Sequence, residues 1–222
     1  MQKYLSLYPL PINFVLMKPW FFIFFILPLL GFAYVVWHVW QILPLSPSWK
    51  GAVVGLMLLS VVCLFSHFLI GPDSLPLAAG RVVYEVGTSS LFILLYLVMI
   101  FLLLDIGRLV RLVPPSFLHH SVAGSVGILL FVCALFVYAN ANYRNKQMRT
   151  MELHAARPLS SPMRIVMLSD MHIGYHNPVK ELARWVDMIN AASPDVVLIA
   201  GDIIDGSMKP LREENMAAVF RR

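Results

Sequence analysis

The sequence has little charge and very little cysteine. Only 13% of its 222 residues are Asp, Glu, Lys or Arg, whereas about 25% is usual in a soluble globular domain, so the chain cannot be one water-soluble globule. Its two cysteines, Cys63 and Cys133, each lie in a long apolar run and have no Cys-x-x-Cys partner. This excludes a disulfide-stapled secreted module and a thiolate metal or redox site.

The few charges are unevenly distributed along the chain. Residues 1–142 contain 9 of the 29 charged side chains, and residues 143–222 contain the other 20. Because these two parts suit different solvents, we expect a membrane anchor over residues 1–142 and a polar part after it.

Four uncharged windows in the first part are long enough to cross a bilayer, whose hydrocarbon core of about 30 Å needs roughly 20 helical residues. They predict a four-helix transmembrane bundle with helices near residues 20–41, 51–71, 87–105 and 120–140. Turn-forming Gly and Pro also lie between the windows. The charges that separate the windows, expected at or beyond the helix ends, are Lys50, Asp73, Arg81, Glu85, Asp105, Arg108 and Arg111.

The positions of Lys and Arg indicate how such a bundle is oriented, because cytoplasmic loops are enriched in both. With four spans, seven of these residues fall on one side of the membrane and three on the other. The seven are Lys3, Lys18, Arg81, Arg144, Lys146, Arg149 and Arg157, and the three are Lys50, Arg108 and Arg111. We therefore expect a multi-pass protein of the inner (cytoplasmic) membrane with both termini in the cytoplasm.

The polar part begins with a basic juxtamembrane linker over residues 143–162 and continues with a strand, helix and strand pattern within residues 163–222. Residues 164–169 and 195–200 are short, mainly apolar runs of aliphatic side chains, which is typical of buried strands. After Pro178, apolar residues recur at steps of three and four, which is typical of an amphipathic helix. This pattern predicts an α/β fold in which a βαβ unit holds two parallel strands.

Three side chains that can bind a metal follow the predicted strands: Asp170 and His172 after the first, and Asp202 after the second. Reactive groups of open α/β sheets collect beyond the carboxyl ends of the strands. If the strands are adjacent, about 4.8 Å apart, the carboxylates can share a cation and the imidazole can add a nitrogen ligand. Such a set suits Mn²⁺, Fe or Zn²⁺. The alternative is that both aspartates only close turns or cap a helix.

Residues 164–206 resemble the opening of a calcineurin-like metallophosphoesterase, with that family's Asp-x-His and Gly-Asp motifs each closing a strand. The resemblance implies that Asp170 and His172 bind one divalent metal ion and that Asp202 bridges it to a second. It also implies hydrolysis of phosphomonoester, phosphodiester or pyrophosphate bonds. The order of several membrane helices and then such a domain is similar to membrane-anchored bacterial members of the family.

The sequence departs from the family at the second metal site, which draws on a Gly-Asn-His motif and later histidines. Only 20 residues follow Asp202, and they contain neither His nor Cys. We therefore expect a C-terminally truncated domain, the first βαβ unit of an incomplete metallophosphoesterase β-sandwich. One sheet face would lack its cover, the second metal site would be incomplete, and this chain would have little or no catalysis and no catalytic residue beyond the metal ligands.

The sequence thus predicts a fragment of a membrane-anchored, metal-dependent phosphoesterase whose partners are the lipid bilayer and a phosphate ester. Anchoring favours a lipid-linked substrate. One alternative is a non-enzymatic four-helix membrane protein with a vestigial phosphoesterase tail. A small transporter is disfavoured because the central turns of the helices lack charged residues. Binding to nucleic acid is disfavoured because the basic residues form no aromatic-interleaved face.

Overall fold

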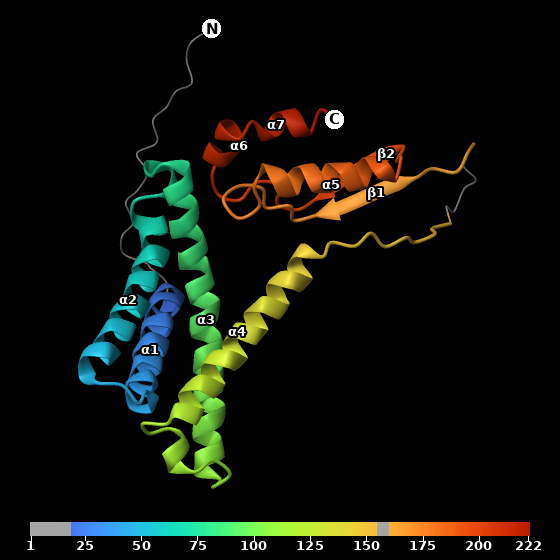
Figure 1. Ribbon diagram of the computed structural model, residues 1–222. Helices are drawn as coiled ribbons and strands as arrows, with labels where there is room; N and C mark the ends of the chain where they lie inside the picture. Colours follow the sequence, from blue (N-terminus) through green and yellow to red (C-terminus); the bar gives the residue numbers. More distant parts are fainter. Residues whose placement is uncertain (1–18, 155–159) are drawn as a thin grey trace.

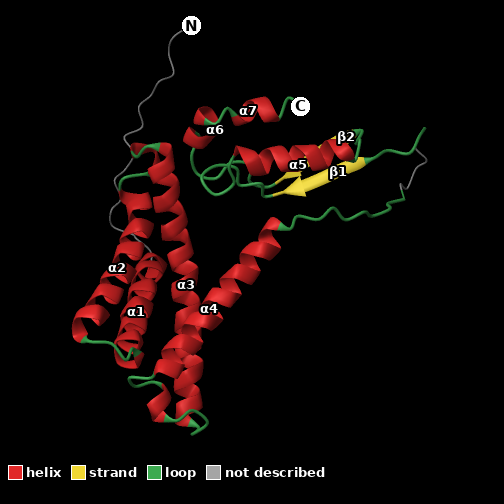
Figure 2. Cartoon of the chain, viewed as in Figure 1, coloured by secondary structure: helices red, strands yellow, loops and turns green. Residues whose placement is uncertain are grey.

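The computed structural model describes residues 19–154 and 160–222, apart from the side chains of residues 19–25, 67, 68 and 72. A helical part is followed by a smaller α/β part, which lies beyond one end of the long helices (Figures 1 and 2). The helical part consists of α1 (Pro19–Ile42), α2 (Pro47–Leu69), the short 3₁₀ helix η1 (Pro72–Ser74), α3 (Leu77–Leu109), the 3₁₀ helix η2 (Pro115–Phe117) and α4 (Val122–Arg144).

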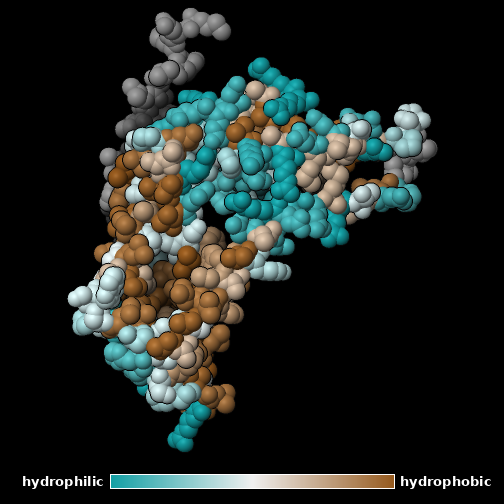
Figure 3. Space-filling view, viewed as in Figure 1, coloured by the Kyte–Doolittle hydropathy of each residue, from teal (hydrophilic) through white to brown (hydrophobic). Residues whose placement is uncertain are grey.

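Three of the four long helices are long and apolar enough to cross a membrane, namely α2 over Pro47–Ser66, α3 over Leu77–Leu109 and α4 over Val122–Arg144. Within the described side chains, α1 contributes a shorter apolar stretch, Ile26–Ile42. Apolar side chains cover the outside of this part, whereas the α/β part is mainly hydrophilic (Figure 3). Three predicted spans therefore coincide with helices of suitable length and composition, and the span near residues 20–41 coincides with α1. That these helices cross a membrane at the predicted bounds stays a prediction.

Helix α3 is longer than the span predicted near residues 87–105, and that prediction was wrong at both ends. The helix contains 33 residues, which at 1.5 Å per residue makes it about 50 Å long, against a bilayer core of about 30 Å. Arg81 and Glu85 continue the helix instead of ending it, because both are good helix formers. The first turns of α3 consequently project beyond an apolar layer of bilayer thickness.

Close approach of the backbones fixes the packing of α2 against α3. A Cβ atom added at Gly87 of α3 would lie 2.8 Å from the Leu64 backbone of α2, so only glycine permits this contact. Lys50, expected near a helix end, lies in the first turn of α2 and is buried. Its ammonium donates a hydrogen bond of 2.7 Å to the Trp40 carbonyl near the end of α1, where a positive charge is favourable.

A polar cluster joins α1 to α3 inside the helical part. The Asp105 carboxylate accepts a hydrogen bond of 2.6 Å from the Tyr34 hydroxyl and lies 3.0 Å from Nε2 of His38. The His38 ring is buried and stacks on Phe101, with 4.5 Å between ring centroids. Asp105 thus lies within α3 and bonds to a neighbouring helix. Such pairing offsets the cost of burying polar groups.

The α/β part contains the predicted βαβ unit, which is confirmed. Strands β1 (Ile165–Ser169) and β2 (Val196–Ala200) are parallel, and Ser169 pairs with Ala200. Helix α5 (Val179–Ala191) connects them, and the short helices α6 (Lys209–Glu213) and α7 (Met216–Val219) follow. The core combines side chains of α5, α7 and the loop after β1, namely Leu182, Val186, Met171, Ile173, Met216 and Val219.

Among the described residues, helix covers one face of the β1–β2 sheet. Leu168 packs against the core under α5. On the other face, Ile165 and Met167 are 49% and 67% exposed. Sheets in stable domains bury such an apolar face against a second layer, so the expectation of an uncovered sheet face is confirmed.

Candidate metal centre

The parallel register places Asp170, His172 and Asp202 at one edge of the sheet. Asp170 directly follows β1, and its N–H donates to the Ala200 carbonyl at the end of β2 (3.0 Å). Two residues further, the His172 N–H donates to the Asp202 carbonyl (3.1 Å). The backbone pairing therefore continues past the strands and makes the two predicted motifs neighbours, as the sequence led us to expect.

The spacing of the Asp-x-His motif follows from the packing of this loop. Met171 and Ile173 are buried in the core, whereas Asp170 and His172 are exposed. Asp170 and His172 also adopt left-handed backbone conformations, with φ of 49° and 44°. Such conformations cost energy in residues other than glycine and are common at active sites. The loop thus holds the two polar side chains outward while its apolar ones fix it to the domain.

Gly201, the glycine of the Gly-Asp motif, lies against the Asp170 side chain. A Cβ atom added there would be 3.0 Å from the carboxyl carbon of Asp170 and would overlap one of its oxygens. The φ of Gly201 is 84°, a conformation that glycine adopts readily. Glycine at this position therefore gives the Asp170 carboxylate its place beside the second motif.

Asn177 holds the loop from the inside and was not identified from the sequence. It is 2% exposed, and its amide donates to the carbonyls of Met171 (3.0 Å) and His172 (3.2 Å). Its side-chain oxygen accepts a hydrogen bond of 3.0 Å from the Tyr143 hydroxyl of α4. The Asn-Pro pair before α5 is a turn signal, which could have indicated a structural role but not these partners.

The edge that carries the three residues faces the ends of the long helices α3 and α4. Tyr143 of α4 reaches Asn177, and the Tyr84 hydroxyl of α3 donates to the Asp205 carboxylate at 2.5 Å. Asp205 also donates its N–H to the Ile173 carbonyl (3.0 Å). Both contacts join the membrane helices to the loops that contain the candidate ligands.

Comparison with known proteins relates the sequence of this part to one family. The family model of the calcineurin-like phosphoesterases matches residues 163–221. This segment is similar to that family and is called the phosphoesterase segment below. The phosphoesterase segment includes both strands, both motifs and all three candidate ligands, and the match confirms the resemblance that the motifs indicated.

The relatives of this chain include proteins whose names describe them as transmembrane. An uncharacterized metallophosphoesterase of Campylobacter jejuni is 32% identical over 85 residues, 38% of this chain and 23% of that protein. A transmembrane protein with metallophosphoesterase domain from Danio rerio is 44% identical over 50 residues, 22% of this chain and 11% of that protein. A putative metallophosphoesterase of Caenorhabditis elegans is 25% identical over 163 residues, which are 69% of this chain and 33% of that protein.

The match to the Caenorhabditis elegans protein is longer than the phosphoesterase segment, so it also includes part of the helical region. The chain spans between 11% and 33% of the length of these three relatives. No solved structure matches the chain. Since the relatives come from a bacterium and from animals, they do not single out the bacterial type.

The three candidate ligands of the phosphoesterase segment fit a divalent ion by their chemistry, and the backbone brings their loops together. All three are exposed at one sheet edge, and together they offer carboxylate oxygen and imidazole nitrogen, which suit Mn²⁺, Fe and Zn²⁺. In the described parts of the chain, no three side chains of His, Cys, Asp or Glu converge closely enough to hold one ion. Exposed side chains change rotamer readily, so the assignment of these ligands stays a prediction.

Proposed function

We propose that the protein is a membrane-anchored, metal-dependent phosphoesterase in which Asp170 and His172 bind one divalent ion and Asp202 bridges it to a second. The observation that supports this most directly is the backbone pairing of the two motifs, with His172 bonded to Asp202 and Asp170 to Ala200. The family match supports the same reaction class. Mn, Fe or Zn are the metals that the donor set favours.

The residues of this chain supply the framework of the reaction. Two divalent ions, when bound, activate water and neutralise charge on the phosphoryl oxygens. Asp170, His172 and Asp202 would hold and orient these ions, Gly201 leaves room for the Asp170 carboxylate, and Asn177 fixes the loop backbone. The Gly-Asn-His motif of the family does not occur in residues 1–222, so we expect the 222-residue chain to bind metal but to hydrolyse phosphate esters poorly.

We further propose that α1 is a fourth span and that both termini lie in the cytoplasm, at the inner membrane. The enrichment of Lys and Arg on one side supports this orientation. The contacts of Tyr84 and Tyr143 with the phosphoesterase segment also support it, because they put the start of α3 and the end of α4 on the same side as that segment.

The substrate is proposed to be a phosphate ester linked to a lipid. The candidate ligands lie on the sheet edge that faces α3 and α4, where the headgroup region of a bilayer would be. The full-length protein in vesicles should therefore hydrolyse a phosphorylated lipid faster than the corresponding water-soluble ester. Equal rates on both substrates would contradict a lipid-linked substrate but not the phosphoesterase activity.

The metal assignment is tested by Mn²⁺ binding to the full chain in detergent. Asp170→Asn, His172→Ala and Asp202→Asn should each weaken binding by about tenfold or more, because each removes a metal ligand. Matched controls are Asp187→Asn and His176→Ala, which change exposed residues outside the proposed ligand set and should leave the affinity unchanged.

A non-enzymatic membrane protein with a vestigial tail is the second candidate function. It is favoured by the finding that no three ligating side chains converge in the described residues. If wild-type chain binds no Mn²⁺, or if the three ligand variants bind it as well as the controls do, this second function replaces the first.

A further inference from the structure

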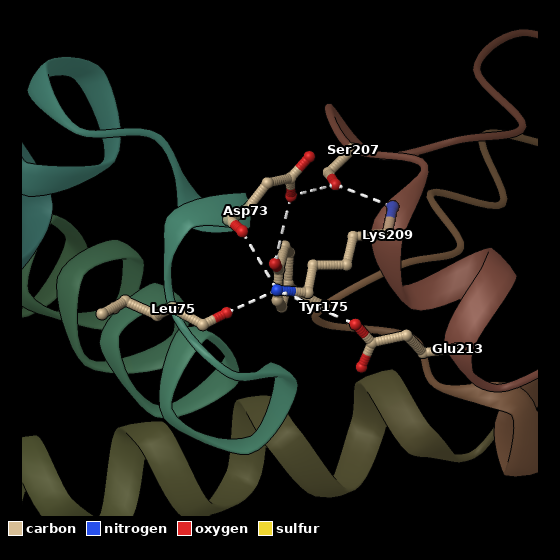
Figure 4. A network of polar contacts seen from close by, with 6 residues as sticks. All are labelled: Asp73, Leu75, Tyr175, Ser207, Lys209 and Glu213. Carbon is tan, nitrogen blue, oxygen red and sulfur yellow. Dashed lines mark hydrogen bonds and ion pairs between the residues drawn. The ribbon is translucent and has the colours of Figure 1, made fainter.

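The contact between the membrane helices and the phosphoesterase segment is polar and centred on three residues that we call the docking patch: Asp73 of η1, and Arg81 and Tyr84 of α3. The Asp73 carboxylate accepts hydrogen bonds from the Ser207 hydroxyl (2.5 Å) and the Tyr175 hydroxyl (3.2 Å). Figure 4 shows Asp73 and Leu75 on one side and Ser207 and Lys209 on the other, with Tyr175 between them.

Lys209 of α6 also bonds to the η1 loop. The Lys209 ammonium donates to the carbonyls of Asp73 (3.0 Å) and Leu75 (2.6 Å) and lies 3.7 Å from the Glu213 carboxylate. Its positive charge is thus held between the backbone of the η1 loop and an acidic side chain of α6. Hydrogen bonds that involve a charged group are stronger than those between neutral groups.

Arg81 links α3 to the loop that follows β1 and to the start of α5. Its Nε donates to the Tyr175 carbonyl (3.1 Å), three residues after His172. Its Nη2 donates to Glu214 (2.6 Å), whose other carboxylate oxygen accepts from the N–H of Val179, the first residue of α5. One guanidinium from a membrane helix therefore fixes the loop carbonyl and, through Glu214, the start of α5.

Tyr84 reaches the second motif. Its hydroxyl donates to the Asp205 carboxylate (2.5 Å), and its ring stacks on Tyr175 with 5.6 Å between centroids. Asp205 follows Asp202 by three residues and is bonded through its N–H to Ile173, the residue after His172. Tyr84 therefore contacts the point at which the loops of both motifs are joined.

We infer that the docking patch positions the metal-binding loops, so that the membrane helices are a structural part of the metal centre and not only a tether. Asp73, Arg81 and Tyr84 are positioning residues, since they touch Tyr175, Asp205 and Glu214 but not the candidate ligands. This inference rests on the proposed function for the role of the loops. The contacts themselves do not depend on it.

The experiment compares docking variants of the full chain in detergent with matched controls. Tyr84→Phe and Asp73→Asn each remove hydrogen-bonding capacity from the patch, whereas Tyr138→Phe and Asp187→Asn make the same changes at exposed positions away from it. The readouts are amide hydrogen exchange of residues 170–177 and Mn²⁺ affinity. The docking variants should exchange faster in this segment and bind Mn²⁺ about two- to tenfold more weakly, the range expected for one hydrogen bond.

A double-mutant cycle separates positioning from general loss of stability. If Tyr84 acts through Asp205, the effect of Tyr84→Phe on Mn²⁺ affinity should largely disappear in an Asp205→Ala background, whereas independent effects would add. Additive effects, or exchange and affinity unchanged in both docking variants, would overturn the inference. If the wild-type chain binds no Mn²⁺, the proposed function fails, and the exchange measurement still decides whether the patch holds the loops.

Discussion

Two neighbouring residues, Asp170 and Gly201, determine the geometry at the centre of the candidate site. The left-handed φ of 49° at Asp170 turns the chain at the end of β1, and Gly201 accommodates its carboxylate at the end of β2. A side chain at position 201 would have to displace the Asp170 carboxylate. The glycine of the Gly-Asp motif is thus needed for steric reasons, independently of the metal-binding role proposed for Asp202.

Replacing Gly201 by alanine tests this steric reason. Gly201→Ala should lower the free energy of unfolding by about 1–3 kcal/mol, because it adds both a clash with Asp170 and strain at positive φ, and it should weaken Mn²⁺ binding. Gly206→Ala is the matched control, since Gly206 also has positive φ (62°) but has open space around its Cβ position. Equal effects of the two substitutions, measured by chemical denaturation and by Mn²⁺ titration, would show that the clash is unimportant.

At the scale of elements, α3 has two roles in one continuous helix. Its apolar length is suited to crossing a membrane, and its first turns provide Arg81 and Tyr84 of the docking patch. Because a helix transmits its direction along its whole length, the orientation of the phosphoesterase segment is linked to that of α3. Helix α4 adds a second connection through Tyr143 and Asn177.

The Tyr175 hydroxyl makes this docking sensitive to alkaline pH. Its burial, together with the hydrogen bond to Asp73, raises the pKa of Tyr175 to about 12 from 10.0. Since the folded pKa lies above the unfolded one, the stabilisation is complete below pH 10 and is lost as the pH rises towards 12. Wild-type chain should therefore lose more stability than Tyr175→Phe across this window in denaturation curves, and parallel losses would contradict the role of Tyr175.

The elements were predictable where local pattern decides them, and the contacts between them were not. Scarce charge indicated the apolar helices, and short aliphatic runs followed by Asp-x-His and Gly-Asp indicated the parallel strands and their common edge. The ends of α3 were wrong because Arg81 and Glu85 look like loop residues beside an apolar run. The docking patch was missed because its partners are far apart in sequence, for example Asp73 and Tyr175 at a separation of 102 positions, and no local pattern relates them.

At the scale of the whole molecule, most of the large exposed apolar side chains belong to the helical part, whereas the face of the phosphoesterase segment seen in Figure 3 is mainly hydrophilic. The candidate ligands lie at the junction of the two, on loops held by side chains from both. A site at this junction would meet a phosphate group carried by a lipid without removing the lipid from the bilayer.

The account depends most on the claim that the loops at this junction bring an imidazole and two carboxylates to one ion. Pulsed electron paramagnetic resonance of Mn²⁺ bound to chain labelled with ¹⁵N-histidine tests it directly. The account predicts a nitrogen hyperfine coupling that disappears in His172→Ala and persists in His176→Ala. Bound Mn²⁺ without any histidine coupling, or a coupling that survives in His172→Ala, would contradict it.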